Sequence, residues 1–268
     1  MEKLSEKEIR QKLNNNEKFT FVILESINST NTEAKNLACK NAAENTVVLA
    51  EHQTSGKGRM SRKFSSPEGT GIYMSLILKP KLSAENAVMI TTAAAVAVSQ
   101  AIESVANVKT GIKWVNDIYI GDKKVCGILA ESASSSLNSD FKYVILGIGV
   151  NVFEPTDGFP DEIKEIAGAI YKNNHKIHKA RNLLVAEILN RFEEIYSNLP
   201  KTKYMDYYKE KSILTGKEIQ ILKAGEVCSE ATVEGINNCG ELVVKYKNGI
   251  TESLSSGEVS VKKKVTNE

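Results

Sequence analysis

Two segments of this chain concentrate side chains that could handle an anionic substrate. Residues 53–64 read QTSGKGRMSRKF, and residues 113–132 read KWVNDIYIGDKKVCGILAES. The cations are Lys57, Arg59 and Arg62 in the first segment and Lys124 in the second, which also holds a carboxylate, Asp117. Glycines beside the cations leave backbone N–H groups uncovered, so the loop can fold onto a phosphate or a carboxylate. Together the two segments favour a site for an anionic nucleotide, with Asp117 as a possible metal contact.

Each segment alone has an ordinary structural interpretation. The basic loop has neither the Gly-Lys-Ser/Thr ending of a Walker A loop nor the third glycine of a dinucleotide-binding fingerprint. It could be a solvated turn, and residues 113–117 could be a plain strand with Trp114 in the core. Upstream, Thr30 with Glu33 predicts a capping box at a helix start. The N–H groups of such a helix start could also bind polar or anionic ligand groups.

Composition excludes several classes of protein. The chain has 268 residues with 35 Lys and Arg against 33 Asp and Glu, a net charge of +2 that does not favour general nucleic-acid binding. No uninterrupted apolar run reaches the length of a membrane span, and the first residues lack the apolar region of a signal peptide. We therefore expect a cytoplasmic protein without membrane contact. Four widely spaced cysteines predict reduced, mostly buried thiols, and His52, His175 and His178 show no metal pattern.

The hydrophobic pattern predicts mixed strands and helices followed by a small all-β region. Strands are expected at 19–24, 47–50, 71–78, 113–120, 124–131 and 143–152, and helices at 31–40, 83–106, 161–172 and 179–199. Gly121-Asp122-Lys123 predicts a hairpin turn, and Ser83 is a candidate cap for the long helix. From residue 214 onward only short strands are expected, at 217–222, 230–236, 242–247 and 257–261. Such a region is typical of a small β-barrel.

The order of these motifs resembles the biotin protein ligases over nearly the whole chain. Ser29-Thr30-Asn31, Gln53 with GKGRxxR, KWxNDxYxxDKKxxGIL and GIGVN at 147–151 follow one another as in that family. The resemblance implies an α+β fold of the class II synthetase-like biotin/lipoate ligase type. That fold is a mixed β-sheet with helices on one side, followed by an SH3-like β-barrel. The implied organisation is an extension at 1–18, a catalytic domain at 19–208 and the barrel at 212–264.

The resemblance also implies an activity and a site. Such an enzyme makes biotinyl-5′-AMP from biotin and MgATP, then transfers biotin to a lysine of a biotin carboxyl carrier domain. The implied catalytic residues are Lys124 and Arg59, and Asp117 is the candidate Mg²⁺ contact. The biotin-binding set is Ser29, Thr30, Asn31, Gln53, Lys57, Gly58, Arg59, Lys124 and Gly127. The nucleotide-binding set is Arg59, Arg62, Trp114, Asn116, Lys124 and Asn151.

Two other activities and several open points remain at this stage. A lipoate or octanoate ligase or transferase would share the fold, and a non-catalytic biotin- or nucleotide-binding protein would share the pocket. The polar set at 29–31 with Gln53 argues against an acyl-chain ligand. Fewer than twenty residues precede Phe19, so we expect no sequence-specific DNA binding by a winged helix. The chain could be a monomer or a homodimer.

Overall fold

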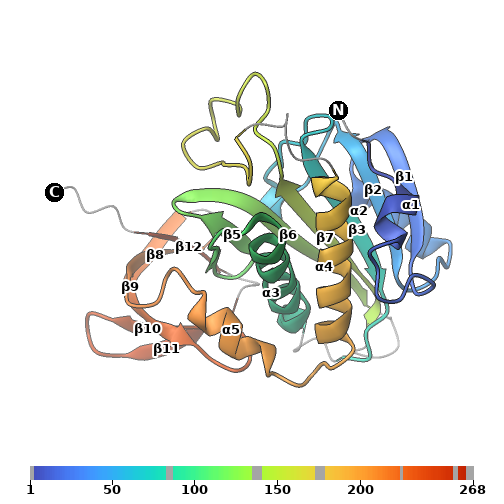
Figure 1. The fold of residues 1–268 in the computed structure, drawn as a ribbon. Coiled ribbons are helices and arrows are strands. Elements are labelled where there is room, and N and C mark those ends of the chain that lie inside the picture. Colours follow the sequence, from blue (N-terminus) through green and yellow to red (C-terminus); the bar gives the residue numbers. More distant parts are fainter. Residues whose placement is uncertain are drawn as a thin grey trace.

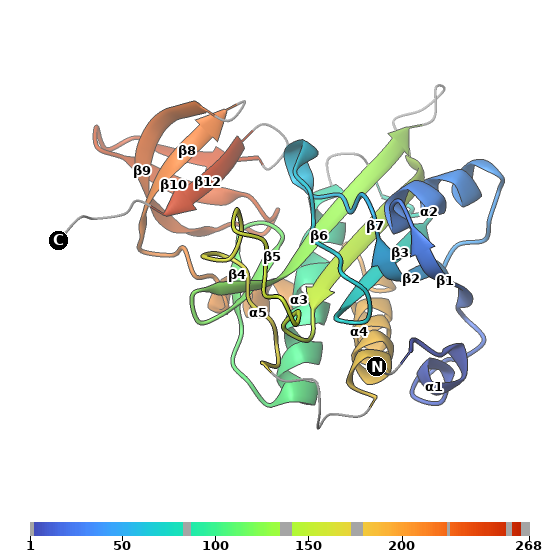
Figure 2. The same cartoon turned by 90° about the horizontal axis from the view of Figure 1, so that it is seen from above.

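The computed structural model describes residues 3–82, 87–134, 141–172, 179–223, 226–255 and 259–263. A seven-stranded mixed sheet forms the larger part, in the order β1-β2-β3-β7-β6-β5-β4 (Figures 1 and 2). Its strands are β1 (Thr20–Ile27), β2 (Thr46–Gln53), β3 (Gly71–Leu78), β4 (Gly111–Lys113), β5 (Asp117–Ile120), β6 (Lys123–Ser134) and β7 (Phe141–Asn151). Only β1 and β2 are parallel, and the other neighbouring strands are antiparallel.

Alternation along the strands divides the sheet into two faces. On β3, Ile72, Met74 and Leu76 belong to the main core, whereas Ile77 packs in a smaller cluster. The main core lies against α3 (Ala87–Ala106) and α4 (Ala180–Tyr196), and the smaller cluster lies under α2 (Thr30–Cys39). The expectation of helices on one side of the sheet was therefore wrong, because α2 covers part of the opposite face (Figure 2).

A five-stranded antiparallel sheet forms the C-terminal part, in the order β11-β10-β9-β8-β12. Its strands are β8 (Glu218–Lys223), β9 (Glu226–Ile236), β10 (Leu242–Tyr246), β11 (Thr251–Leu254) and β12 (Val259–Lys263). A short helix, α5 (Tyr204–Glu210), connects it to the larger sheet (Figure 1). The predicted fold, a mixed α+β domain with a small SH3-like barrel, is confirmed. The domain boundaries at 18, 208 and 212 stay predictions.

Most elements expected from periodicity are present, and the exceptions have local causes. The Thr30–Glu33 capping box is wrong: Ser29 is the N-cap, and the Thr30 hydroxyl contacts Gln53 and Ser75 instead. The predicted helix at 161–172 is a series of turns, because its backbone pairs with Lys124. The hairpin at 121–123 is confirmed. Ser83 lies outside the described residues.

The N-terminal segment packs on α4 through polar contacts. Its helix α1 (Glu6–Arg10) begins after Ser5, whose N–H donates to Asn182 at 2.9 Å. Beneath it, Arg181 on α4 binds Glu51 on β2 at 2.7 Å, with the two side chains 2% and 6% exposed. Since an isolated buried charge is costly, the pair and its hydrogen bonds fix α4 on the sheet.

Two further expectations change in the folded chain. Val88–Ala106 in α3 is long and apolar enough to cross a membrane, yet 67% of its most apolar stretch is buried inside the protein, as in a core helix. All four cysteines are free, as expected, but Cys39, Cys228 and Cys239 are exposed and Cys126 is buried. The expectation of mostly buried thiols was wrong.

Candidate active site

One cavity of ≈390 Å³ lies on the face of the sheet that α2 partly covers. It brings together every residue that the sequence nominated for a site. They are Ser29, Thr30, Asn31, Gln53, Lys57, Gly58, Arg59, Arg62, Trp114, Asn116, Asp117, Lys124, Gly127 and Asn151. These residues come from the start of α2, the end of β2, the basic loop, the turn after β4, and strands β5 to β7. Sequence segments more than a hundred residues apart therefore meet in one place.

The start of α2 supplies a set of fixed polar groups. The N–H of Thr30 donates to Gln53 Oε1 at 2.8 Å, and the Gln53 Nε2 donates to Ser66 at 2.8 Å. Ser29, Thr30 and Asn31 are each no more than 5% exposed. Because both ends of the Gln53 amide are bonded, its orientation is defined, and the set can recognise a small polar ligand.

The basic loop after β2 is a tight hairpin. Gly58 N–H donates to the Arg62 carbonyl at 2.7 Å, and Phe64 N–H donates to the Gly56 carbonyl at 2.9 Å. A Cβ at residue 56 would lie 2.4 Å from the Phe64 carbonyl, so the close approach requires glycine. At the tip, Met60 has φ 54° and Ser61 has φ 58°. Residues other than glycine adopt this left-handed region at a cost of roughly 1 kcal/mol each.

Lys124 and Asp117 form the charged centre of the cavity. Lys124 Nζ lies 2.7 Å from Asp117 Oδ1, and the side chains are 29% and 22% exposed. Asp117 Oδ1 is buried and the contact does not have hydrogen-bond angles, so this oxygen has no directed donor. Gly127 makes room for Lys124, since a Cβ there would lie 3.2 Å from Nζ. The lysine is thus held in the cavity by charge and shape.

The aromatic ring of Phe64 packs against two glycines of the sheet, Gly149 and Gly127. A Cβ at Gly149 would lie 2.7 Å from the ring, and one at Gly127 would lie 3.5 Å from it. Sequence reasoning did not nominate Phe64 for the site, although it immediately follows the basic loop. Glycines at 127, 147 and 149, on neighbouring strands, were the signal in the sequence that could have indicated a hollow of ligand size.

Residues 160–168 form a second border of the cavity that the sequence did not predict. Lys124 N–H donates to the Ile166 carbonyl at 2.7 Å, and Gly168 N–H donates to the Lys124 carbonyl at 2.9 Å. Asn151 Nδ2 also donates to the Gly168 carbonyl at 2.9 Å. Through these bonds the segment fixes the backbone of Lys124 and the amide of Asn151, and it places Ile163 and Ile166 in the lining.

The turn after β4 is held from three directions. Trp114 Nε1 donates to the Gly240 carbonyl of the barrel at 2.9 Å, and the Tyr208 hydroxyl on α5 donates to the Val115 carbonyl at 2.9 Å. Asn116 Nδ2 donates to the Ile128 carbonyl at 2.7 Å. The nominated residues Trp114 and Asn116 are therefore oriented by the C-terminal domain and the connecting helix as well as by the sheet.

Positive charge dominates the described lining of the cavity. Six cations line it, namely Lys57, Arg59, Arg62, Lys63, Lys113 and Lys124, against the single carboxylate of Asp117. Burial lowers the pKa of Arg59, and the nearby Asp117 partly opposes that shift. Arg59 Nη1 also donates to Asn116 Oδ1 at 3.2 Å, which ties the basic loop to the turn after β4. Such a surface is complementary to a polyanion.

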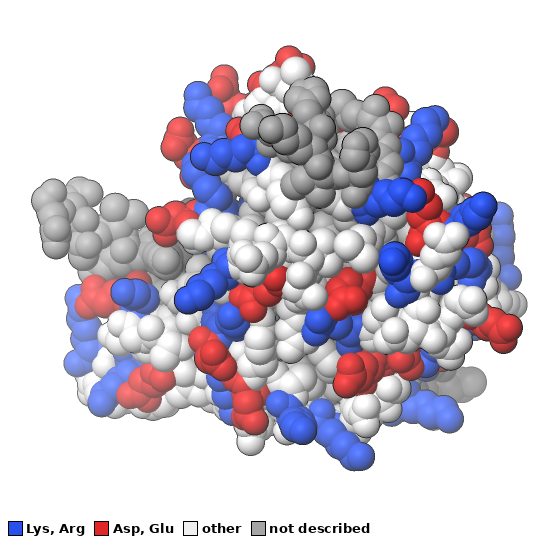
Figure 3. All heavy atoms as spheres, viewed as in Figure 1, with Lys and Arg blue, Asp and Glu red and all other residues white. Residues whose placement is uncertain are grey.

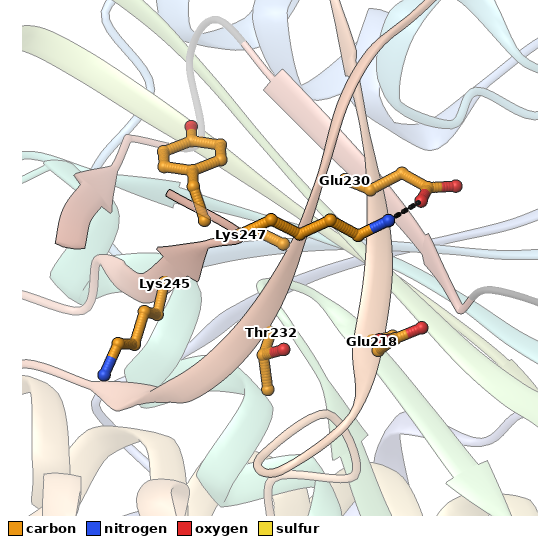
Figure 4. A pocket seen from close by; sticks show the side chains of 7 residues that line it. Glu218, Glu230, Thr232, Lys245 and Lys247 are labelled. Carbon is orange, nitrogen blue, oxygen red and sulfur yellow. Dashed lines mark ion pairs between the residues drawn. The ribbon is translucent and has the colours of Figure 1, made fainter. Parts of the chain in front are cut away.

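Within the described part of the chain, no three His, Cys, Asp or Glu side chains gather at a metal-binding distance. A smaller hollow of ≈120 Å³ on the barrel carries charges of both signs (Figure 4). There Lys247 lies 3.7 Å from Glu230, so part of this charge is already neutralised within the hollow.

Comparisons with known proteins agree with this geometry. Residues 23–151 match the Biotin/lipoate A/B protein ligase family, and residues 214–262 match the Biotin protein ligase C terminal domain. A bifunctional ligase/repressor BirA of Bacillus spizizenii is 44% identical over 196 residues, which are 72% of this chain and 59% of that protein. This chain thus spans less than two thirds of that relative's length.

Two other relatives are matched over most of their length. A biotin–[acetyl-CoA-carboxylase] ligase of Paracoccus denitrificans is 28% identical, with 85% of this chain and 95% of that protein covered. The biotin protein ligase from Aquifex aeolicus in complex with biotin and ATP superposes with a TM-score of 0.74 at 27% identity, covering 91% of this chain and 99% of that one. The resemblance found in the sequence is confirmed: this chain contains a catalytic domain of the biotin/lipoate A/B protein ligase family, joined to the C-terminal domain of biotin protein ligases.

Proposed function

We propose that this chain is an ATP-dependent biotin protein ligase. It would activate biotin as biotinyl-5′-AMP with release of pyrophosphate, then transfer biotin to a lysine of a biotin carboxyl carrier domain. One observation carries the proposal: a single cavity joins a fixed polar set at the start of α2 to six cations. The relatives named biotin ligases and the complex of one of them with biotin and ATP support it.

The polar end of the cavity suits the uncharged ring of biotin. Thr30 and Gln53 offer hydroxyl and amide groups held by hydrogen bonds of 2.8 to 3.1 Å. A cyclic urea has N–H donors beside a carbonyl acceptor, and such groups can pair with these. Because the site would lose those pairs with a plain acyl chain, it favours a urea over lipoate or octanoate.

The cationic end suits the first chemical step. A carboxylate oxygen of biotin attacks the α-phosphorus of ATP, a new O–P bond forms, and the bond to pyrophosphate breaks. Two anions must meet, and Lys124, Arg59 and Arg62 are placed to offset their repulsion and to stabilise the charge of the transition state. Lys124 is the best placed for the reacting carboxylate and phosphate, since its backbone and side chain are both held.

Magnesium would enter with ATP as part of the substrate. Mg²⁺ commonly takes one or two carboxylates together with substrate phosphates. Asp117 fits one such contact, because its buried Oδ1 lacks a directed donor. When bound, the ion would screen phosphate charge, and Asp117 would also hold Lys124 in place until the nucleotide arrives.

In the second step the lysine amine of the carrier attacks the acyl carbon of the adenylate, and AMP leaves. The mixed anhydride is already activated, so the protein's main task is to position the amine. We further propose that the partner is the carrier domain of a biotin-dependent carboxylase, as the name of the Paracoccus relative suggests. A cytoplasmic location and a monomeric or homodimeric state complete the proposal.

One assay separates the candidate activities. ATP–pyrophosphate exchange is measured with biotin, with lipoate and with neither, and a purified carrier domain is then added to detect biotin transfer by mass spectrometry. We expect exchange with biotin alone, followed by modification of one carrier lysine. Exchange with lipoate in place of biotin would establish the alternative ligase, and nucleotide binding without exchange would overturn the enzymatic proposal.

Weak, non-specific DNA binding by this chain is part of the proposal. Figure 3 shows Lys and Arg interspersed with Asp and Glu over the displayed face, and the net charge is +2. Affinity for DNA should be non-specific and fall steeply as salt rises. Fluorescence anisotropy with an operator-like and a scrambled duplex checks this, and sub-micromolar preference for the first would contradict it.

A further inference from the structure

A chain of hydrogen bonds runs from the cavity wall to a carboxylate outside the lining. Thr30 and Asn31 line the cavity, and Glu131 on β6 is not among the lining residues. Asn31 Nδ2 donates to Glu131 Oε2 at 2.7 Å, and Asn31 Oδ1 lies 2.6 Å from the Ser75 hydroxyl. Ser75 is fully buried, and its Oγ lies 2.8 Å from Thr30 Oγ1.

The sheet leaves a space for the Asn31 side chain. A Cβ at Gly147 on β7 would lie 2.1 Å from Asn31 Oδ1, so only glycine leaves room for the amide. The Asn31 side chain is therefore confined between β3, β6 and β7, where its two ends face different partners. Which end faces which partner determines how the remaining hydrogen bonds can run.

Glu131 selects one of the two amide orientations. An ionised carboxylate only accepts hydrogen bonds, so Asn31 must turn its NH₂ group toward Glu131 and its oxygen toward Ser75. An amide oxygen cannot donate, so the single hydroxyl hydrogen of Ser75 goes to Asn31. The contact between Ser75 and Thr30 must then use the hydrogen of Thr30.

The consequence lies at the cavity surface. Gln53 Oε1 already receives the Thr30 N–H at 2.8 Å, so it keeps a donor when the Thr30 hydroxyl, 3.1 Å away, turns to Ser75. With its hydrogen donated to Ser75, Thr30 Oγ1 keeps both of its lone pairs free for the cavity. It is then an acceptor for a ligand N–H.

We propose that Glu131 is a positioning residue that makes Thr30 an acceptor for an N–H group of the ligand, and so selects a cyclic urea over an acyl chain without N–H. This inference rests on the proposed function for its ligand, and it adds a residue that does not touch that ligand. In Glu131→Gln, the side chain at position 131 can also donate, so Asn31 can turn either way. In the turned form Ser75 donates to Thr30 and occupies one of its two lone pairs, and the Thr30 hydroxyl donates to Gln53.

The test compares five proteins: wild type, Glu131→Gln, Asn31→Asp, the swap that combines these two changes, and the control Glu33→Gln. In the swap, the amide introduced at position 131 donates to the carboxylate introduced at position 31. That carboxylate still accepts from Ser75, so the original direction returns. The control removes the same charge from an exposed contact on α2, where Asn36 Nδ2 lies 3.3 Å from Glu33. Calorimetry gives the Kd for biotin, exchange kinetics give the KM for MgATP, and thermal melting gives the stability.

Glu131→Gln should raise the Kd for biotin roughly tenfold, the size expected for one lost hydrogen bond, and leave the KM for MgATP within about twofold. The swap should recover most of the affinity, and Glu33→Gln should match wild type. An unchanged Kd in Glu131→Gln, or a swap weaker than the single variant, overturns the inference while the ligase proposal stands.

Failure of the proposed function gives a different pattern. A wild-type protein that does not bind biotin overturns the ligand assigned to the site. The hydrogen-bond direction is then decided by melting alone, because the Asn31–Glu131 coupling does not need a ligand. The swap should melt closer to wild type than Glu131→Gln does, and additive losses from the two single changes would overturn the positioning role.

Discussion

Lys124 illustrates at the residue scale how the fold places a surface-type side chain inside a cavity. In the sequence it is one lysine of a Lys-Lys pair after a hairpin turn. In the folded chain, Lys123 binds the carbonyls of residues 164 and 165 at 3.0 and 2.9 Å, whereas Lys124 points to Asp117 in the cavity. Adjacent residues on a strand face opposite sides, so one lysine of the pair binds the segment at 164–165 and the other lies in the cavity.

Lys124→Ala should lower ATP–pyrophosphate exchange by a factor of roughly 10²–10³, the usual loss for one preorganised transition-state contact. The melting temperature should change little, because the Lys124 backbone bonds remain. Initial-rate ATP–pyrophosphate exchange assays with biotin and MgATP measure the rate. Lys142→Ala, on the exposed side of β7, is the control. Activity above about a third of wild type would remove Lys124 from the catalytic assignment.

Arg59 connects two segments of the candidate site through its 3.2 Å bond to Asn116. Arg59→Gly removes this bond and adds backbone freedom, while Lys124 stays in place. We expect adenylate formation to continue and the adenylate to escape faster, so that lysines of bystander proteins become biotinylated. Streptavidin blots of a mixture with serum albumin report this. A variant whose labelling stays restricted to the carrier domain would contradict the retaining role.

At the element scale, the two sides of the basic loop are hydrogen-bonded to each other, whereas its tip is exposed. The stems share hydrogen bonds between residues 56 and 64 and between 58 and 62, whereas Met60 is 46% exposed and has a left-handed backbone. Three cations repel one another there until an anion arrives. The loop is therefore suited to close over a ligand and shield a reactive anhydride from water.

Hydrogen exchange tests this closure. Within residues 54–63, the amides of the tip at 59–61 should exchange quickly without ligand and at least tenfold more slowly with biotin and ATP, whereas the stem amides that are already hydrogen-bonded should change less. Amides of β3, which lies in the sheet core, serve as the internal reference. Equal protection of the loop in both states, in protein that demonstrably binds biotin, would show that the loop is a rigid turn.

A second feature at the element scale is a hydrogen-bond network around Glu103, which joins α3 to α5 and to the residue that precedes β4. Glu103 accepts from Lys211 Nζ at 2.7 Å, from Thr110 N–H at 2.8 Å and from the Tyr207 hydroxyl at 3.1 Å. Burial works to raise the pKa of Glu103, but these hydrogen bonds outweigh it and the pKa is lowered. The ionised form therefore stabilises the fold above the usual glutamate pKa, and this stabilisation is lost as pH falls through the lower folded-state value.

Glu103→Gln should lower the free energy of unfolding at pH 7 by roughly 1–3 kcal/mol, because hydrogen bonds to a charged acceptor are lost. The difference from wild type should shrink as pH falls below the usual glutamate pKa of about 4.3, because the unfolded chain then takes up a proton that the folded carboxylate, with its lowered pKa, does not. Urea unfolding at pH 7 and at pH 3.5, approximately half a unit or more below the usual glutamate value, measures both. A difference independent of pH would mean that the carboxylate charge contributes nothing.

On the scale of the whole molecule, the C-terminal barrel takes part in the site. Val261 lines the cavity, Trp114 donates to Gly240, and Tyr208 donates to Val115. The turn that carries Asn116 and Asp117 is thus clamped between the sheet, the connecting helix and the barrel. Barrel placement and catalytic geometry should change together.

Tyr208→Phe tests this coupling. The change leaves a buried Val115 carbonyl without its donor, which should cost roughly 1–3 kcal/mol of stability. Exchange activity should fall roughly ten- to a hundredfold, since small displacements of reacting groups have effects of this size. Tyr246→Phe, whose hydroxyl binds Glu252 at 2.5 Å on the barrel, is the matched control. Full activity with lowered stability would show that the clamp is structural only.

The sequence by itself determined the candidate site residues and most of the strands. Cations between glycines, the strand pair around Gly121 and the apolar run of β7 are local patterns, and local patterns are what propensity and spacing report. Every nominated site residue lines the cavity. Part of the reason is local: the glycines at 127, 147 and 149 leave space on neighbouring strands that a larger residue would fill.

Only the tertiary structure decided which groups orient those residues. Glu131, Tyr208 and the carbonyls of Gly168 and Gly240 act on residues far from them in sequence. Their partners depend on strand order and on where α2 and the barrel pack, and residue spacing does not specify these. The same reason explains the wrong capping box at Thr30 and the wrong helix at 161–172. In both places a long-range hydrogen-bond partner, Gln53 for one and Lys124 for the other, replaced the local contact.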